Sequence, residues 1–498
     1  MIGIKGVGMT PVAQILKKTG YIVSGSDIKE TFFTDKVLKR EKIKFHNGFN
    51  KKNIPVNTDL VIHSSAFRED NNVEMKKVIK RKIPIMLQAE ALAEIFNGYQ
   101  KNIAVCGSHG KTTTSALLGF ILQETGLKPT VEVGSAVPQF KGNAIVGKSD
   151  IMVIEADEYQ NKLKYYQPHV VLLNNIDYDH PDYFKTPVLY QKVFADFVKR
   201  TPKNGFVVAN MSDKNVAKAI KGCKCKIIRY TANNQTTPDT CLPDRQASLN
   251  KEGSYLWINE KIKRGYQYFQ LHKDKKNLGE FKMQLVGEHN VQNTVAVITT
   301  CLELKIPLTK IKKALAKFKG TARRLEKLGK HKGALFIDDY GHHPTEIKTT
   351  LKAIKQMYTS KNIICVFMPH MFTRTKALLN DFAKSFVDAD EILILPTYAS
   401  ARENKTYEIS KELVEKISKS TCSTSKLLVG QEKTVKYIPS IKQCASYLKK
   451  NVTKNDVVIL MGAGDTFRVW NHLKKLMLSP DPEYSGGVKS RTSKVSFR

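Results

Sequence analysis

The run CGSHGKTTT at residues 106–114 constrains the fold of this chain more than any other stretch. Short apolar runs precede and follow it, so the sequence predicts a strand, then a glycine loop, then a helix. Such a loop turns backbone N–H groups and a helix N-terminus toward a polyphosphate. The Lys111 amine then reaches the phosphates, and the Thr112 hydroxyl holds Mg²⁺. Position 105 is Val105, where the common G-x-x-x-x-G-K-T spacing has glycine, so this loop has the shorter form G-x-x-G-K-T.

Length and composition favour a multidomain protein without a membrane-spanning helix. A chain of 498 residues has room for about three domains. It contains no run of about 18 apolar residues, which a membrane-spanning helix requires, and its first residues lack the pattern of a signal peptide. The eight cysteines are scattered and mostly lie in apolar runs, so we expect reduced cysteines and a cytoplasmic location.

The net charge of +35 raises the alternative of a nucleic-acid-binding protein with a phosphate loop. Against this alternative, the charge is spread along the whole chain, comes mostly from lysine, and forms no dense block interleaved with aromatic residues. We therefore expect solvated lysine faces that help to attract anionic substrates, and no nucleic-acid partner. Residues 479–498 form a basic end of low complexity, which predicts a disordered tail.

The chain divides into three segments, residues 1–97, 98–318 and 319–478, and a short tail. In each segment short apolar runs alternate with helical patterns, which is typical of α/β domains with parallel sheets. Residues 231–282 differ because they are polar, alternating and rich in turns, so they predict an antiparallel insert.

Polar residues follow several of the predicted strands, where ligands of parallel sheets bind. Glu155 emerges from a buried strand near the phosphate loop and is a candidate Mg²⁺ ligand. His180 lies in a polar loop after another strand, where it could hold a second metal ion or position a phosphate. The segment DDYGHHPTE at residues 338–346 is too compact for a standard zinc site, so we expect substrate contacts there.

Weaker signals come from three other places. Residues 3–8, GIKGVG, form a glycine turn whose spacing differs from G-x-G-x-x-G. It indicates either diphosphate binding, with Asp27 on a ribose, or only a tight turn. Asn290 and Asn293 share a helix face, where they read a base or cap the helix. Two arginines, the first of them Arg323, follow a predicted hinge and suit phosphate binding.

Together these motifs resemble the Mur ligase family, over residues 1 to about 475. The most specific parts of the resemblance are residues 107–114, 155–159, 177–184, 338–346 and 462–465. The resemblance implies an N-terminal Rossmann-like UDP-substrate domain, a central P-loop ATPase domain and a C-terminal Rossmann-like ligase domain, with boundaries at 97/98 and 318/319.

The resemblance also implies an ATP-dependent ligase of peptidoglycan synthesis that uses Mg²⁺. ATP would phosphorylate the carboxylate of UDP-N-acetylmuramate, and the amine of L-alanine would attack the acyl phosphate, with release of ADP and phosphate. A monomer or homodimer is expected. One alternative is a family member that attaches a preformed murein tripeptide to the same nucleotide sugar. A folylpolyglutamate-synthase-like ligase is a more distant alternative, which the N-terminal UDP-type segment disfavours.

Roles for individual residues are likewise implied by the resemblance. The implied catalytic residues are Lys111, Glu155, His180, Arg323 and His343. The implied nucleotide contacts are Gly107, Ser108, His109, Gly110, Lys111, Thr112, Thr113, Asn290, Asn293, Arg323 and Asp338. The implied metal ligands are Thr112, Glu155 and His180. The implied substrate contacts are Gly3, Lys5, Gly6, Val7, Gly8, Asp27, Ser64, Ser65, His343 and Arg374.

Overall fold

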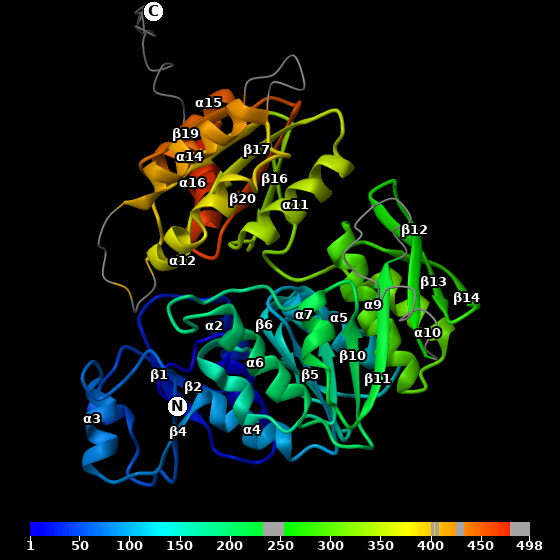
Figure 1. Ribbon diagram of the computed structural model, residues 1–498. Helices are drawn as coiled ribbons and strands as arrows, with labels where there is room; N and C mark the ends of the chain where they lie inside the picture. Colours follow the sequence, from blue (N-terminus) through cyan, green and yellow to red (C-terminus); the bar gives the residue numbers. More distant parts are fainter. Residues whose placement is uncertain (233–252, 400–402, 404–407, 425–432, 479–498) are drawn as a thin grey trace, which may run out of the picture.

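The computed structural model describes residues 1–232, 253–399, 403, 408–424 and 433–478, without the side chains of 421–424. Two parallel strand pairs near the N-terminus are followed by a ten-stranded and a six-stranded sheet, each with its own helices. The C-terminal part lies over the central part, and the N-terminal part lies at one side of the central part (Figure 1). The predicted basic tail, residues 479–498, lies outside the described residues.

The N-terminal part is built around short parallel strands, as the sequence predicts. Ile2 makes parallel bridges to Ser26 and His63, and so it joins the two strand pairs. Its strands are β1 (Ser24–Asp27), β2 (Lys44–Asn47), β3 (Val61–His63) and β4 (Ile85–Leu87). Its helices are α1 (Met9–Lys18), α2 (Phe33–Arg40), η1 (Lys51–Asn53), α3 (Val73–Lys80) and α4 (Gln88–Asn97).

The central sheet has the strand order β14-β13-β12-β11-β10-β9-β5-β8-β6-β7. Its strands are β5 (Lys101–Cys106), β6 (Thr130–Val137), β7 (Gly142–Ile145), β8 (Ile151–Glu155), β9 (Val170–Leu173), β10 (Phe206–Asn210), β11 (Lys226–Ala232), β12 (Tyr255–Lys263), β13 (Tyr266–Lys273) and β14 (Lys276–Met283). Its helices are α5 (Lys111–Glu124), η2 (Pro138–Phe140), η3 (Tyr159–Tyr165), α6 (Pro187–Val198), α7 (Lys214–Ala219), α9 (Glu288–Glu303) and α10 (Leu308–Lys317).

The predicted antiparallel insert is confirmed over β12, β13 and β14, which pair antiparallel, while residues 233–252 of the predicted segment lie outside the described residues. Buried and partly exposed residues alternate along β13, so one face of the insert packs Phe269 and Leu271 into the core beside Trp257. Strand β5 lies between β8 and β9, and α5 follows it directly, with residues 112–122 all buried. The phosphate loop is therefore held between a central strand and a buried helix.

The C-terminal sheet has the order β15-β16-β20-β17-β18-β19, in which β15 alone is antiparallel to its neighbour. Its strands are β15 (Glu326–His331), β16 (Ala334–Asp339), β17 (Asn362–Phe367), β18 (Glu391–Ile394), β19 (Thr434–Tyr437) and β20 (Asp456–Met461). Its helices are α11 (Pro344–Met357), α12 (Phe372–Ala377), α13 (Leu379–Ala383), α14 (Ile409–Thr424), α15 (Ile441–Asn451), η5 (Asp465–Phe467) and α16 (Arg468–Leu478). The carboxyl ends of β16, β20 and β17 lie side by side, so the polar segments after them meet at one edge.

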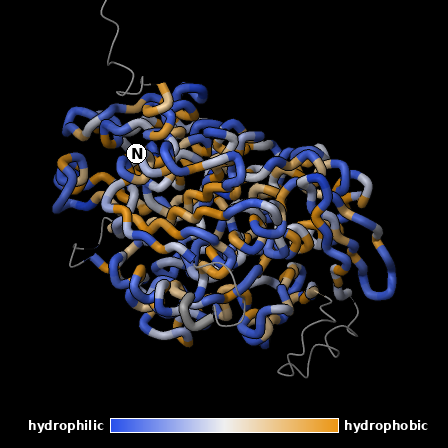
Figure 2. The backbone as a smooth tube through the Cα atoms, turned by 90° about the horizontal axis from the view of Figure 1, so that it is seen from above, coloured by the Kyte–Doolittle hydropathy of each residue, from blue (hydrophilic) through white to orange (hydrophobic). Residues whose placement is uncertain are grey.

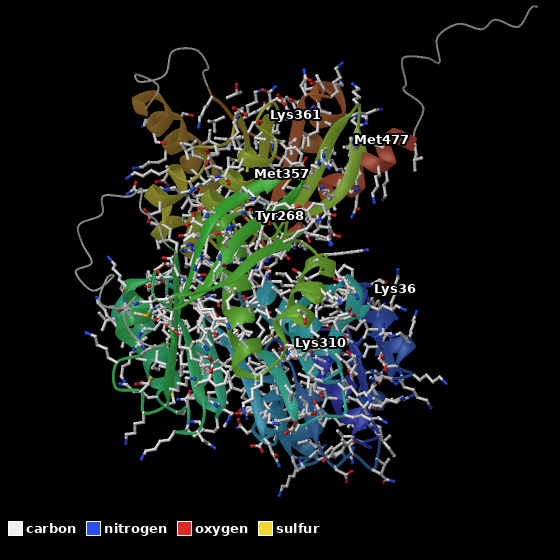
Figure 3. All side chains as sticks on the ribbon, turned by 90° about the vertical axis from the view of Figure 1, so that its right-hand side faces the viewer. Lys36, Tyr268, Lys310, Met357, Lys361 and Met477 are labelled. Carbon is white, nitrogen blue, oxygen red and sulfur yellow. The ribbon has the colours of Figure 1, made fainter. Side chains whose placement is uncertain are left out.

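Hydrophobic residues concentrate in the interior of each part, and hydrophilic segments form much of the outside (Figure 2). Lys36 and Lys310 are both exposed, and Lys36 lies at the edge of the molecule in Figure 3. The described residues therefore fit the expected solvated lysine faces. In the part of the chain that the structure describes, no helix has the length and apolar character needed to cross a bilayer.

Candidate nucleotide and acyl-transfer site

The phosphate loop takes a backbone conformation that requires its glycines. Gly107 and Gly110 have φ of +134° and +80°. A Cβ on Gly110 would lie 2.4 Å from Asn293 Oδ1, and one on Gly107 would lie 3.0 Å from the Asn175 backbone. The glycines thus allow α9 and the segment after β9 to approach the loop closely.

Lys111 begins α5, and its amine is enclosed by oxygen atoms. The amine donates to the carbonyl oxygens of Gly107 at 2.6 Å and Ser108 at 3.2 Å, and to a Glu158 carboxylate oxygen at 2.8 Å. Burial disfavours the charged amine, but the charges of Glu158 and Asp157 outweigh burial and raise the pKa of Lys111 above its ordinary value. Lys111 is therefore a fixed positive charge inside the loop.

Thr112 and Glu155 meet, as expected of two ligands of one metal ion. The Thr112 hydroxyl donates to Glu155 Oε1 at 2.9 Å, and the Gly134 N–H donates to Oε2 at 2.8 Å. Burial raises the pKa of Glu155. A hydroxyl and a carboxylate are hard oxygen donors of the kind that Mg²⁺ takes, so the donor set fits this ion.

Glu132 is a second buried carboxyl beside Glu155, and no motif in the sequence predicts it. The Glu155 N–H donates to Glu132 Oε2 at 3.3 Å. Burial, and next the charge of Glu155, raise the pKa of Glu132 to about 8. A single acid inside the apolar strand β6 gives no signal in the sequence, because its partner is reached only through the pairing of β6 with β8.

His180, the third expected metal ligand, lies beside Glu158. Its ring packs on Tyr159 with centroids 4.5 Å apart, and its Nε2 lies 3.8 Å from both Glu158 Oε1 and Asp179 Oδ2. Its buried Nδ1 has no hydrogen-bond partner among the described residues. The structure therefore connects His180 to Lys111 through their shared partner Glu158, whereas Thr112 and Glu155 contact each other.

His109 of the phosphate loop contacts carboxylates of both the central and the C-terminal parts. Its ring nitrogens lie 3.1 Å from Asp177 Oδ2 and 3.3 Å from Glu346 Oε1. The Thr345 hydroxyl donates to the same Asp177 oxygen at 2.6 Å. Burial disfavours the imidazolium, but hydrogen bonds to the two carboxylates outweigh burial and raise the pKa of His109 to about 10.

The group His109, Asp177 and His343 has ligand atoms within 4.8 Å of one another, as a metal site would. A protonated His109 offers no lone pair, however, and both of its nitrogens face carboxylates. His343 caps α11, where its Nδ1 accepts from the Thr345 N–H. In the arrangement that the structure describes, these residues join the central and C-terminal parts.

Arg374 makes a second, deeply buried contact between the same two parts. Its guanidinium lies against Asp179, with Nε 2.8 Å from Oδ1 and Nη2 3.3 Å from Oδ2. Burial disfavours the carboxylate, but the Arg374 charge outweighs burial and holds the pKa of Asp179 well below its usual range. Arg374 is an expected substrate contact. In this structure, in which the central and C-terminal parts touch, its guanidinium contacts Asp179 instead.

A cavity of about 680 Å³ lies beside the phosphate loop, between α9 and α11. Five of the expected nucleotide contacts line it: His109, Gly110, Thr113, Asn290 and Asn293. Helix α9 belongs to the central part and α11 to the C-terminal part, so both parts form its walls (Figure 1). The size and position of the cavity fit a nucleoside attached to a phosphate chain in the loop.

The expected nucleotide contacts Arg323 and Asp338 do not line this cavity, but their neighbours Arg324 and Asp339 do. The Arg323 guanidinium instead lies 3.1 Å from Asp338 and donates to the carbonyl oxygen of Gly462 at 2.7 Å. Adjacent residues of a strand point to opposite faces, so only one of the two aspartates at the end of β16 faces the cavity.

The expected substrate contacts of the N-terminal part gather at the carboxyl ends of β1 and β3. The glycine turn, residues 3–8, leads directly into α1, and Ser64 and Ser65 follow β3. Lys5 is 2% exposed, and its amine donates to the Glu30 carbonyl oxygen at 2.6 Å. The Asp27 carboxylate accepts the Lys5 N–H at 2.7 Å. Both charged groups thus hold the turn in place.

Domain models of one family match this chain in order along its length. Their descriptions are Mur ligase family, catalytic domain, for residues 1–100; Mur ligase middle domain, for residues 105–301; and Mur ligase, glutamate ligase domain, for residues 323–464. The chain is 36% identical over 469 residues to a UDP-N-acetylmuramate–L-alanine ligase of Alkaliphilus metalliredigens. That alignment covers 94% of this chain and 95% of the relative.

Two solved structures share the fold. A UDP-N-acetylmuramate–alanine ligase from Thermotoga maritima matches with a TM-score of 0.74 at 24% identity, over 96% of this chain and 98% of that one. A murein peptide ligase from Psychrobacter arcticus matches with a TM-score of 0.68 at 21% identity, over 95% of this chain and 97% of that one. Since the matched domains and the Alkaliphilus relative together span nearly the whole sequence, this chain belongs to the Mur ligase family.

Proposed function

We propose that this enzyme joins L-alanine to the carboxylate of UDP-N-acetylmuramate, with conversion of ATP to ADP and phosphate, in peptidoglycan synthesis. The observation that carries the proposal is the extent of the match to the Alkaliphilus alanine ligase, 36% identity over 94% of the chain. The murein peptide ligase from Psychrobacter arcticus is 21% identical, so attachment of a preformed tripeptide is the less supported alternative.

The geometry supports phosphoryl transfer at the start of α5. Lys111 is a buried cation among the carbonyl oxygens of the loop, where it would neutralise charge that develops on the transferred phosphoryl group. Thr112 and Glu155 would hold Mg²⁺, and the buried Nδ1 of His180 would accept a second ion. Bound Mg²⁺ would supply further neutralisation of phosphate charge. The cavity lined by Asn290 and Asn293 would hold the nucleoside of ATP.

The contacts between the central and C-terminal parts support protection of the acyl phosphate from water. Arg374 with Asp179, and His109 with Glu346, close the two parts around the end of the phosphate loop. A closed site would let the amine of alanine, rather than water, reach the acyl phosphate. His343 would lie next to the reacting groups, because its ring packs on that of His109 with centroids 4.8 Å apart.

We also propose that the enzyme works in the cytoplasm as a monomer or homodimer, without a nucleic-acid partner. Six cysteines of the described residues are free thiols and five of them are buried, which supports a reducing compartment. Exposed lysines such as Lys36 and Lys310 lie in different parts of the molecule, which supports attraction of anionic substrates rather than one binding face for nucleic acid.

The acceptor assay tests this function. With UDP-N-acetylmuramate, ATP and Mg²⁺ present, L-alanine should stimulate phosphate release about tenfold or more over glycine, L-serine or the murein tripeptide. Chelation of Mg²⁺ should stop the reaction, and added Mg²⁺ should restore it. If the tripeptide is the only acceptor that stimulates phosphate release, the enzyme attaches a preformed tripeptide. If no acceptor stimulates phosphate release, the ligase function is refuted.

A further inference from the structure

An apolar patch is exposed beside the glycine turn of the N-terminal part. Val7 in the turn is 45% exposed, Ile28 just after β1 is 37% exposed, and Phe32 just before α2 is 42% exposed. Large apolar side chains grouped at the carboxyl end of a parallel strand are placed where ligands of such sheets bind. A ligand bound at this edge of the sheet would therefore contact these apolar side chains.

Contacts of Lys5 join the patch into one unit. The Lys5 N–H donates to Asp27, just before Ile28, and the Lys5 amine donates to the Glu30 carbonyl oxygen. The Thr34 hydroxyl donates to the Lys5 carbonyl oxygen at 2.6 Å. The segment from Asp27 to Thr34 is thus hydrogen-bonded to the glycine turn. Phe32 belongs to this segment, so its position relative to the turn is fixed.

One side of the Phe32 ring faces a buried cation. The Lys5 amine lies 5.7 Å from the centroid of the Phe32 ring and 5.9 Å from that of Phe45. Because Lys5 is almost fully buried, its ammonium makes a cation–π interaction with the side of the Phe32 ring that faces the protein interior. The exposed part of the ring remains available to a second planar group.

We propose that Phe32 is the stacking platform for the uracil of the UDP substrate. This inference rests on the proposed function and deepens it, because it names the residue that recognises the base. A diphosphate at the glycine turn would place the attached nucleoside near Asp27 and the apolar patch. Stacking of a base on an exposed aromatic ring contributes to affinity without hydrogen bonds to the base edge.

Binding of UMP and of ribose 5-phosphate to the full-length protein tests the proposal by calorimetry. Phe32→Ala and Phe32→Leu should weaken UMP binding about tenfold and leave the weaker binding of ribose 5-phosphate unchanged. Phe32→Tyr should keep UMP affinity within about twofold, because the ring is retained. Phe33→Ala is the matched control, since Phe33 is the adjacent ring and is 38% exposed. Thermal unfolding of each variant checks that it is folded.

The outcomes separate this inference from the proposed function. Equal UMP affinity in the wild type and Phe32→Ala would overturn the stacking role, as would a wild type that does not bind UMP or a Phe33→Ala variant that shows the same loss. In the ligase assay, Phe32→Ala should raise the KM for UDP-N-acetylmuramate about tenfold while the KM for ATP stays constant. A wild type that binds UMP through Phe32 but ligates no amino acid would refute the function and leave the stacking role standing.

Discussion

Replacement of Lys111 by alanine should lower kcat for ligation by at least about 10²- to 10³-fold while the protein stays folded. The Lys111 amine is the cation enclosed by the carbonyl oxygens of Gly107 and Ser108 and by Glu158. Without it, Glu158 and the transferred phosphoryl group would face each other as uncompensated negative charges. Steady-state kinetics with ATP, UDP-N-acetylmuramate and L-alanine measure the effect.

Lys101→Ala is the matched control for Lys111. Lys101 starts β5, the same strand that leads into the phosphate loop, and its side chain is 53% exposed in a pair with Asp150. Exposed pairs contribute little to stability, so this variant should keep kcat within about twofold of the wild type. If Lys111→Ala keeps wild-type turnover, the assignment of the phosphate loop is wrong.

Replacement of Arg374 by alanine should uncouple ATP consumption from amide formation. The change leaves the Asp179 carboxylate buried without its cation, and breaking a buried pair costs about 3–5 kcal/mol. Asp179 belongs to the central part and Arg374 to the C-terminal part. The substitution should therefore destabilise the arrangement in which these two parts are in contact. We expect kcat for ligation to fall about a hundredfold or more, with residual phosphate release exceeding amide formed because water enters.

Parallel measurements of phosphate and of amide product test Arg374→Ala. Arg374→Lys should recover part of the activity, because lysine restores the charge but not the two-point contact with Asp179. Arg468→Ala is the control in the same part of the chain, since the Arg468 side chain is 56% exposed in its pair with Asp465. Equal activities of Arg374→Ala and Arg468→Ala would contradict a role for domain closure.

Much of the fold follows from local patterns in the sequence. The glycine loop after an apolar run predicts β5 and α5, and the alternating polar stretch predicts the antiparallel strands β12 to β14. These features depend on neighbouring residues in the chain, so a sequence contains their signals. The domain boundaries at 97/98 and 318/319 remain predictions.

The parts of the site that the sequence could not reveal depend on contacts between distant segments. Asp338 and Asp339 are equivalent in the sequence, and only the pairing of β16 determines that Asp339 lines the cavity. Lys5 looks like a free cation in a glycine turn, but the segment after β1 folds over it and buries it. Glu132 gains significance only from the neighbouring strand that brings Glu155 beside it.

We infer that the phosphate loop activates the carboxylate of UDP-N-acetylmuramate as an acyl phosphate. The most direct test of this activation is the transfer of ¹⁸O from that carboxylate during ligation of L-alanine. If both carboxylate oxygens are labelled, attack on the acyl phosphate leaves one labelled oxygen in each released inorganic phosphate and the other in the amide carbonyl. Mass spectrometry of the phosphate should therefore show one ¹⁸O per molecule, and phosphate released without ¹⁸O would contradict the account.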